Sequence, residues 1–296
     1  MNSDELAAEF AEHRAVLVGA AYRVVGSVAD AEDVVQETWL RWSTAEHAEV
    51  RDVRAYLVRI TTRLALNRLR QQKSRREQYV GPWLPEPIAA ADQDPAAVAE
   101  VADSVSMAML VVLETLSPLE RAAFVLREVF DLPFSEIADT LGRSEAAVRQ
   151  LAHRAREHVH ARQPRHRVDK ARHQEITSRF LTATWSGDYD QVVAMLAPDV
   201  ELVSDGGGKR RAALRPVHGS DKVGRWLIAV MSPEQTAGLE FGSAMLNGEQ
   251  AFVAYDGPAV DTVGFMDLDE NGLISRIYVV RNPDKLKAVP GREQRG

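Results

Sequence analysis

SPLERAAFVLREVFDLPFSEIADTLGRSEAAVRQLAHRAREHVH, residues 117–160, is the stretch on which the interpretation of this chain depends. It opens with a helix-start signal, in which Ser117 is the N-cap, Pro118 takes the first helical position and Glu120 follows three residues after the cap. Asp131 and Pro133 end this helix. Its apolar stripe recurs at helical spacing and consists of Leu119, Ala122, Ala123, Leu126 and Val129.

Two further helices follow within the same stretch. Gly142 permits a tight turn between them, and Ser144 is placed to cap the second one. A short helix, a glycine-containing turn and a longer helix form the helix-turn-helix pattern. The inward residues are Ile137, Ala138 and Leu141 on the first helix and Val148, Leu151 and Ala155 on the second.

The outward face of the second helix is basic. Seven arginines against two glutamates lie between residues 143 and 167, in a chain whose net charge is −7. A three-helix bundle with a solvated basic face is one interpretation, but this local charge favours a helix that reads DNA in the major groove. The residues that we expect to face DNA are Arg143, Ser144, Arg149, Gln150, His153 and Arg154.

Composition limits the function classes. The 296 residues include no cysteine, which excludes disulfides, thiolate metal sites and thiol catalysis. The most apolar stretch, residues 107–113, is far shorter than the roughly 20 residues of a membrane-spanning helix. We therefore expect a cytoplasmic protein with no membrane partner.

Three helices are predicted before this stretch. Residues 4–25 form an amphipathic helix that Gly26 ends, and DAEDVVQETWLRW, residues 30–42, begins another helix with its acids placed early. The acidic face is either solvated or a docking surface for a basic partner. After a polar loop, residues 43–52, comes the basic helix VRAYLVRITTRLALNRLRQQKSRRE, which starts at Val53. A membrane surface is conceivable for such a helix, but its apolar side is needed to complete the bundle, so nucleic acid is the better partner.

These residues resemble a known family. DAEDVVQETWLRW followed by RAYLVRITTRLALNRLR is similar to region 2 of the extracytoplasmic-function sigma factors, and the stretch from Ser117 to Arg156 is similar to their region 4. The resemblance implies a dissociable subunit of bacterial RNA polymerase that selects promoter DNA. Region 4 would then read the −35 element. The residues that would face the clamp coiled coil of core polymerase are Asp30, Glu32, Asp33, Gln36 and Glu37. Those that would open and hold the −10 element are Ser43, His47, Arg54, Arg59, Arg63, Asn67, Arg68 and Arg70.

Residues 78–100, QYVGPWLPEPIAAADQDPAAVAE, separate the two regions. Three prolines within six residues make this linker stiff and extended. Trp83 and Leu84 are exposed unless something covers them, so the segment is either a spacer with a stray tryptophan or a short docking peptide.

The remainder of the chain predicts an α+β domain. Helical stretches at residues 175–185, 189–196 and 220–231 precede four strand-like runs, LEFGSAML, QAFVAYDG, VDTVGFMDLD and LISRIYVV. Asn247-Gly248 and Asn271-Gly272 are strong hairpin turns, so we expect a curved antiparallel sheet. This part resembles the SnoaL-like branch of the cone-shaped NTF2-like fold.

Three short motifs narrow the resemblance. Sigma regions combined with WLPEP, DGGGK and NPDKL are similar to the SigJ-type group, which carries a fused SnoaL-like domain. We expect this domain to pack against the linker and to regulate the sigma regions in cis, positively or negatively, in place of a separate anti-sigma protein. The expected regulatory contacts are Trp83, Leu84, Pro85, Glu86 and Pro87 with Asp205, Gly206, Gly207, Gly208 and Lys209 and with Asn282, Pro283, Asp284, Lys285 and Leu286.

Catalysis is not indicated. DGGGK fails the spacing of a phosphate-binding loop, and we interpret it as a flexible loop. Histidines cluster near residues 153–173 without a pattern that completes a metal site. We expect no enzyme activity, no cofactor and no metal, and leave open a small-molecule ligand of the C-terminal domain. The alternatives are a ligand-sensing helix-turn-helix activator and a SnoaL-like enzyme fused to a DNA-binding module.

The predicted domain boundaries follow from these assignments. Residues 1–78 form region 2, residues 79–104 the linker, residues 105–166 region 4 and residues 167–296 the SnoaL-like domain.

Overall fold

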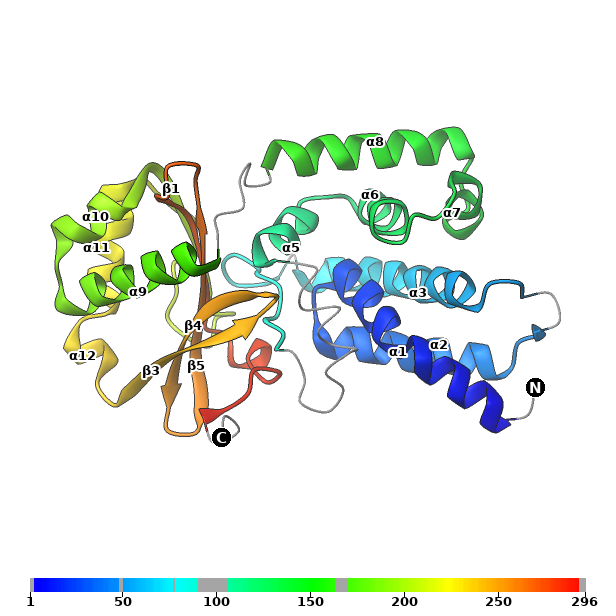
Figure 1. Ribbon diagram of the computed structural model, residues 1–296, viewed down its shortest axis with the longest axis horizontal. Helices are drawn as coiled ribbons and strands as arrows, with labels where there is room; N and C mark the ends of the chain where they lie inside the picture. Colours follow the sequence, from blue (N-terminus) through cyan, green and yellow to red (C-terminus); the bar gives the residue numbers. More distant parts are fainter. Residues whose placement is uncertain (1–2, 48–49, 77, 90–105, 163–169, 293–296) are drawn as a thin grey trace. The chain divides into compact units, whose positions relative to one another are not determined.

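The chain forms two compact units in the computed structural model, which describes residues 3–47, 50–76, 78–89, 106–162 and 170–292. The helical unit comprises residues 1–78 and 90–163, and the sheet unit comprises residues 79–89 and 164–296 (Figure 1). Residues 79–89, called the linker segment below, therefore belong with the C-terminal part of the chain. The predicted domain boundaries remain predictions, and each unit is described by itself.

The first half of the helical unit contains α1 (Ser3–Val25), α2 (Val28–Ser43) and α3 (Val53–Arg76). The start of α2 precedes the expected one, because Ser27 is the N-cap and its side chain accepts a hydrogen bond from the backbone N–H of Asp30. Trp42 is fully buried and donates its indole N–H to the Leu6 carbonyl at 3.3 Å. This bond ties the end of α2 to the start of α1.

The second half contains α5 (Met107–Glu114), α6 (Pro118–Phe124), the π-helical turn η2 (Val125–Val129), α7 (Phe134–Leu141) and α8 (Glu145–Arg162). The capping box between Ser117 and Glu120 is formed as predicted. The expected apolar stripe is wrong at its end, since Val129 is 42% exposed. A π turn holds more residues than an α turn and so rotates Val129 away from the core.

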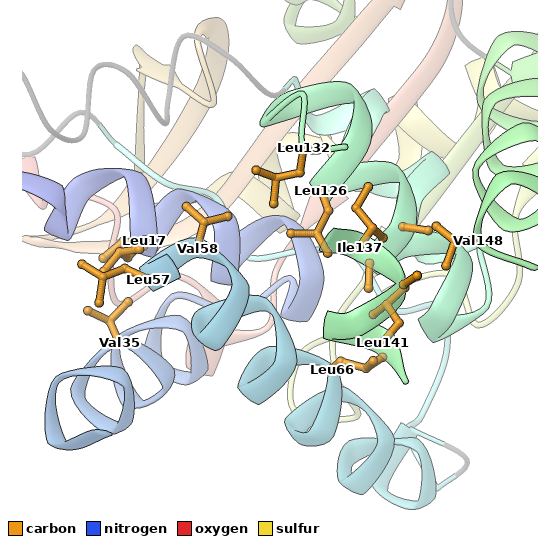
Figure 2. Close-up of a cluster of buried hydrophobic side chains, with 14 of the residues drawn as sticks. Leu17, Val35, Leu57, Val58, Leu66, Leu126, Leu132, Ile137, Leu141 and Val148 are labelled. Carbon is orange, nitrogen blue, oxygen red and sulfur yellow. The ribbon is translucent and has the colours of Figure 1, made fainter. Parts of the chain in front are cut away.

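Both halves share one hydrophobic core (Figure 2). Side chains of α1, α2 and α3 pack against those of α6, η2, α7 and α8 around Leu57, Leu126 and Ile137, each of which is fully buried. A buried polar contact reinforces the core, because the guanidinium of Arg121 donates to the Val24 carbonyl at 2.8 Å. The two segments that resemble sigma regions therefore fold here as one compact body.

The sheet unit begins with the linker segment and continues with the C-terminal elements. Its helices are α9 (Lys170–Ser186), α10 (Tyr189–Met195), α11 (Ser220–Val230), α12 (Pro233–Thr236) and the 3-10 turn η3 (Pro283–Lys285). Its strands are β1 (Leu196–Asp205), β2 (Val217–His218), β3 (Leu239–Leu246), β4 (Glu249–Asp256), β5 (Ala259–Leu268) and β6 (Ile274–Val280).

The six-stranded sheet has the order β2-β1-β6-β5-β4-β3. It is mixed and not wholly antiparallel as expected, because β1 lies parallel to β6, with Leu202 opposite Ile277. The consecutive strands β3 to β6 form the expected antiparallel hairpins, and Asn247 adopts the left-handed φ of 52° that its turn requires. Helices α9, α10 and α11 lie together on one side of the sheet (Figure 1), and Phe180 and Leu227 pack into its core from there.

Candidate functional site

The expected polymerase-facing acids lie on α2 but are not equally available. Asp33, Gln36 and Glu37 are exposed, whereas Asp30 and Glu32 are half-buried. Asp30 accepts a hydrogen bond from Arg68 on α3 at 2.7 Å, and Asp33 accepts another from the same guanidinium at 2.9 Å. The hydrogen bond that Arg68 donates to Asp30 is the main reason why the pKa of Arg68 is raised. The structure thus pairs residues that sequence reasoning assigned to two different partners.

The expected −10 residues extend along α3 and the preceding turn. Arg54, Arg63, Asn67 and Arg70 are exposed, and Arg59 forms an ion pair with Glu136 of α7 at 2.9 Å. Side chains of Lys73, Arg75 and Arg76, and Glu49 in the loop, lie outside the described residues. Arg63, Asn67 and Arg70 share one side of α3, because they follow one another at spacings of four and three residues.

Two residues at the end of α2 bond back to their own helix. Ser43 donates to the Leu40 carbonyl at 3.0 Å, while His47 lies 2.9 Å from the Trp42 carbonyl and packs edge-on against the Trp42 ring. The Ser43 hydroxyl is thus bonded to its own helix at the surface, and His47 packs back onto the end of α2.

The expected −35 residues all lie on the exposed side of α8 and its N-terminal turn. Gly142 ends α7 in the left-handed conformation, and the hydroxyl of Ser144 accepts a hydrogen bond from the backbone N–H of Ala147 at 3.3 Å. Arg149 pairs with Glu145 one turn earlier and stacks over Phe134, and Arg154 pairs with Glu120 at 2.9 Å. Exposed ion pairs of this kind contribute about 0–1 kcal/mol, so both arginines remain available to DNA. Arg143, Gln150 and His153 are exposed beside them.

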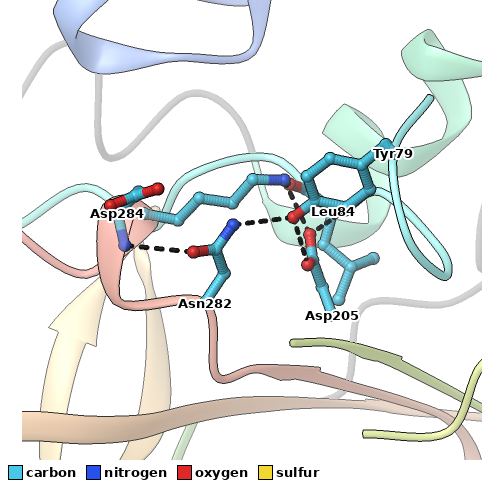
Figure 3. A network of polar contacts seen from close by, with 6 residues as sticks. Tyr79, Leu84, Asp205, Asn282 and Asp284 are labelled. Carbon is cyan, nitrogen blue, oxygen red and sulfur yellow. Dashed lines mark hydrogen bonds and ion pairs between the residues drawn. The ribbon is translucent and has the colours of Figure 1, made fainter. Parts of the chain in front are cut away.

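The linker segment is bound by the sheet unit at a buried lysine (Figure 3). The ammonium group of Lys285, only 3% exposed, donates to the Leu84 carbonyl and to Asp205, each at 2.6 Å. It also lies 3.2 Å from the centroid of the Trp83 ring. A lysine that exchanges water for a carboxylate, a carbonyl and an aromatic face needs all three partners. We call this set, with Tyr79 and Asn282, the lysine clamp.

Asp205 is the acceptor at the centre of the lysine clamp. It ends β1 fully buried and accepts three hydrogen bonds, from Lys285, from the backbone N–H of Leu84 and from the hydroxyl of Tyr79. Its own carbonyl accepts the backbone N–H groups of residues 281 and 282. Each of the three expected motifs thus contributes at least one member to this site.

The glycines after Asp205 have a packing role that was missed. Gly207 has a φ of 59°, and a Cβ there would lie 2.3 Å from the Asn282 side chain and 2.9 Å from the Tyr79 hydroxyl. The loop is closed by hydrogen bonds from residues 209 and 210 to the Gly206 carbonyl. DGGGK therefore forms a tight turn whose lack of side chains leaves room for the linker segment. Lys209 forms an exposed ion pair with Asp284.

Two residues that hold the linker segment in place lie outside the three expected motifs. Tyr79 precedes WLPEP, donates to Asp205 and accepts from the Asn282 amide at 2.8 Å, and burial together with the Asp205 hydrogen bond raises its pKa. Asn247 anchors the other end of the linker segment, because its backbone N–H and side-chain oxygen bond the Ile88 carbonyl and N–H at 2.9 and 3.1 Å. An Asn-Gly pair signals a turn but does not reveal that the asparagine also binds a distant segment.

The remaining contact residues surround this site. Leu84, Pro85, Pro87 and Leu286 are buried, Glu86 is half-buried, and Gly208, Pro283 and Asp284 are exposed. Within the described ranges no cluster of three or more acidic, histidine or cysteine side chains has a metal-binding arrangement, and His166 lies outside those ranges. None of the helices described is both long and apolar enough to span a bilayer.

Comparisons with known proteins follow the same division of the chain. The model for sigma-70 region 2 matches residues 10–75, and that for sigma-70, region 4 matches residues 106–159. The ECF RNA polymerase sigma factor SigJ of Mycobacterium tuberculosis is 41% identical over 299 residues, which cover 97% of this chain and 95% of SigJ. The probable ECF RNA polymerase sigma factor SigI of the same species is 34% identical, over 96% and 95% of the two chains. The crystal structure of M. tuberculosis SigJ superposes with a TM-score of 0.77 at 38% identity, covering 96% of this chain and 99% of that one.

Proposed function

Because the chain belongs to the extracytoplasmic-function (ECF) family of RNA polymerase sigma factors, we propose that it binds core RNA polymerase and directs initiation at its own promoters under the control of its sheet unit. The acidic face of α2 contacts the polymerase, α3 with the turn before it holds the −10 element, and α8 reads the −35 element. The protein works in the cytoplasm, where bacterial polymerase acts, and has no catalytic role of its own.

The exposed basic face of α8 supports the assignment to the −35 element. Arg149 and Arg154 lie on the exposed side of a helix whose opposite side is buried in the shared core, and Arg143 is exposed in the turn before that helix. A rigid helix that presents several long cationic side chains matches the width and the negative charge of the major groove.

The three exposed residues of α2 support the assignment to polymerase. Asp33, Gln36 and Glu37 present carboxylates and an amide on one face, and such a face complements a basic surface. Asp30 contributes indirectly, since its bond to Arg68 fixes α3 against α2.

The lysine clamp is the observation that supports regulation of the sigma regions by the sheet unit of the same chain. The linker segment joins the region 2 and region 4 portions of the chain, and Lys285, Asp205 and Asn247 hold both of its ends on the sheet unit. A bound linker limits how far the two DNA-binding portions can separate. The sheet unit is covalently attached, so it acts at a high effective concentration.

Run-off transcription with sigma-free core polymerase and a library of genomic promoters tests the proposal. We expect discrete start sites that core polymerase alone does not produce. Deleting residues 172–296, deleting residues 282–296, or changing Trp83→Ala should each alter transcript yield.

The controls separate the two halves of the proposal. Failure to initiate from any promoter would contradict the sigma function and favour a ligand-sensing activator. Normal initiation by all three altered chains, each with its helical unit folded by circular dichroism, would instead refute regulation in cis.

A further inference from the structure

An exposed surface of the sheet unit has no role in the lysine clamp. It lies on the loop between β1 and β2, where Lys209, Arg210, Arg211 and Arg215 place four cations within seven residues. Lys209 pairs with Asp284, and Arg210 lies 3.8 Å from Asp261. Arg211 and Arg215 are exposed, and within the part of the chain that the structure describes neither guanidinium has an ion-pair partner. These two charges are free to meet an anion.

Two large apolar side chains lie beside these arginines. Leu214 is 68% exposed and Val80 is 51% exposed. Leu214 lies next to Gly81, because a Cβ added to Gly81 would be 3.7 Å from the Cδ2 of Leu214. Val80 packs over Gly208 in the same way. The linker segment and the β1–β2 loop thus form one surface, which we call the arginine–leucine surface and which comprises Val80, Arg211, Leu214 and Arg215.

The covalent chain keeps this surface near the basic helix α3. Val80 follows Arg76, the last residue of α3, by four positions in the sequence. Four residues of fully extended chain span at most about 14 Å. The chain therefore limits the distance between the C-terminal end of α3 and Val80, however the two units are oriented.

We propose that the arginine–leucine surface binds single-stranded DNA that continues beyond α3, so that the sheet unit contacts the promoter directly. This inference rests on the proposed function, because it takes α3 as the helix that holds the melted −10 element. Arg211 and Arg215 neutralise phosphates. Val80 and Leu214 contact the face of an unstacked base, which a duplex would keep within its stack. An acidic protein would match the arginines, but the tether to α3 favours nucleic acid.

The test measures binding of the full-length chain to a labelled 20-nucleotide single strand of mixed sequence, by fluorescence anisotropy at several NaCl concentrations. Each phosphate contact to a single strand contributes about 0.7 to the slope of log affinity against log salt. Arg211→Ala with Arg215→Ala should therefore flatten the slope by about 1.4. Leu214→Ser should weaken binding severalfold without changing the slope.

Matched controls exclude a general charge effect. Arg179→Ala with Lys222→Ala removes the same charge from exposed positions on α9 and α11 and should leave the slope unchanged. A duplex of the same sequence should be insensitive to Leu214→Ser.

Several results would overturn the inference. The first is that the unaltered chain does not bind the single strand at 50 mM NaCl. The second is that the arginine variant has an unchanged slope. The third is that the substitutions weaken binding to core polymerase but leave binding to the single strand unchanged. Run-off transcription by the unaltered chain separates this failure from failure of the proposed function. Initiation with an unchanged slope removes only the inference, whereas a flattened slope without initiation removes the sigma function and the role of this surface at a promoter, and leaves only its binding of single strands.

Discussion

Lys285 shows how single residues hold the linker segment on the sheet unit. Its ammonium group is buried, so when any one of its partners is removed, water cannot replace the lost contact. Asp205 has the complementary problem, since it is fully buried and accepts the charge of Lys285. Replacing both members by apolar residues would change the stability little, but removing one member leaves a buried charge without its partner. The free energy lost on removing one member is therefore larger than the net contribution of the intact pair.

Lys285→Met should lower the free energy of unfolding by about 3–5 kcal/mol, because Asp205 then remains buried without its cation. Urea denaturation followed by tryptophan fluorescence measures this change. Lys209→Met is the matched control, since its ion pair with Asp284 is half exposed and contributes at most about 1 kcal/mol. Equal losses in the two variants would contradict the account of the lysine clamp.

Asp267 predicts a pH dependence. It is 8% exposed on β5, and burial raises its pKa to about 6 in spite of Arg276 and a hydrogen bond from Tyr278. A pKa that is higher in the folded state favours the neutral acid, so this stabilisation is complete below about pH 4 and is lost as pH rises through 6. The free energy of unfolding of the wild type, relative to that of Asp267→Asn, should thus fall by about 2 kcal/mol between pH 4 and 7. Urea titrations at four pH values measure it, and a constant difference would refute the prediction.

Among single residues, the sequence predicted the contacts that depend only on neighbours a few positions away. Ser117 and Glu120 form their capping box because the rule spans three residues. The bond between Asp30 and Arg68 and the role of Tyr79 depend on segments 38 and 126 residues apart. No local pattern encodes such a pairing.

Among the elements, α8 combines a side that supports the core with a side that we expect to recognise DNA. Its buried side includes Val148 and Leu151, and its exposed side carries the arginines that we expect to face DNA. The ion pair of Arg149 with Glu145 is exposed, so it breaks at little cost when a base edge offers two acceptors.

Arg149→Ala should weaken binding to a −35 sequence selected with the unaltered protein by about 1–3 kcal/mol while leaving random duplex nearly unaffected. Competition binding of holoenzyme at fixed salt measures both affinities. Arg225→Ala is the control, because Arg225 forms an equivalent pair with Asp221 four residues away on α11. A loss that is equal on both duplexes would mean that Arg149 contacts only phosphates.

The ends of helices and the pairing of strands were predicted less well than the elements themselves. The period of 3.6 residues assigns Val129 to the core, but one π turn shifts it out, and only packing determines where such a turn forms. Likewise Asn247-Gly248 predicts a hairpin from two residues, whereas the parallel pairing of β1 with β6 joins two strands that have all the other strands between them in the sequence. Local turns are readable from sequence, and the order of distant strands is not.

For the whole molecule, the shared core of the helical unit raises a geometric problem. Arg59 on α3 touches Glu136 on α7, but promoter elements centred near −10 and −35 lie about 25 base pairs, or roughly 85 Å, apart. In this arrangement the two portions that we propose to bind DNA are too close together to hold both elements. We therefore expect the shared core to open when the promoter complex forms.

A distance measurement checks this opening. The chain has no cysteine, so Arg59→Cys with Glu136→Cys accepts two spin labels without background. The distance between the labels should be short in the free chain and increase by several tens of ångströms in a transcribing complex, because the two elements are so far apart. An unchanged distance in that complex would show that the helical unit works closed.

The central claim is that the sheet unit controls initiation by holding the linker segment. Promoter-dependent run-off transcription with the Lys285→Met chain tests it most directly, because either release of the linker segment or unfolding of the lysine clamp frees the two DNA-binding portions. We predict a transcript yield that differs at least fivefold from that of the unaltered chain, with the Lys209→Met chain unchanged. Equal yields from all three chains would contradict the claim.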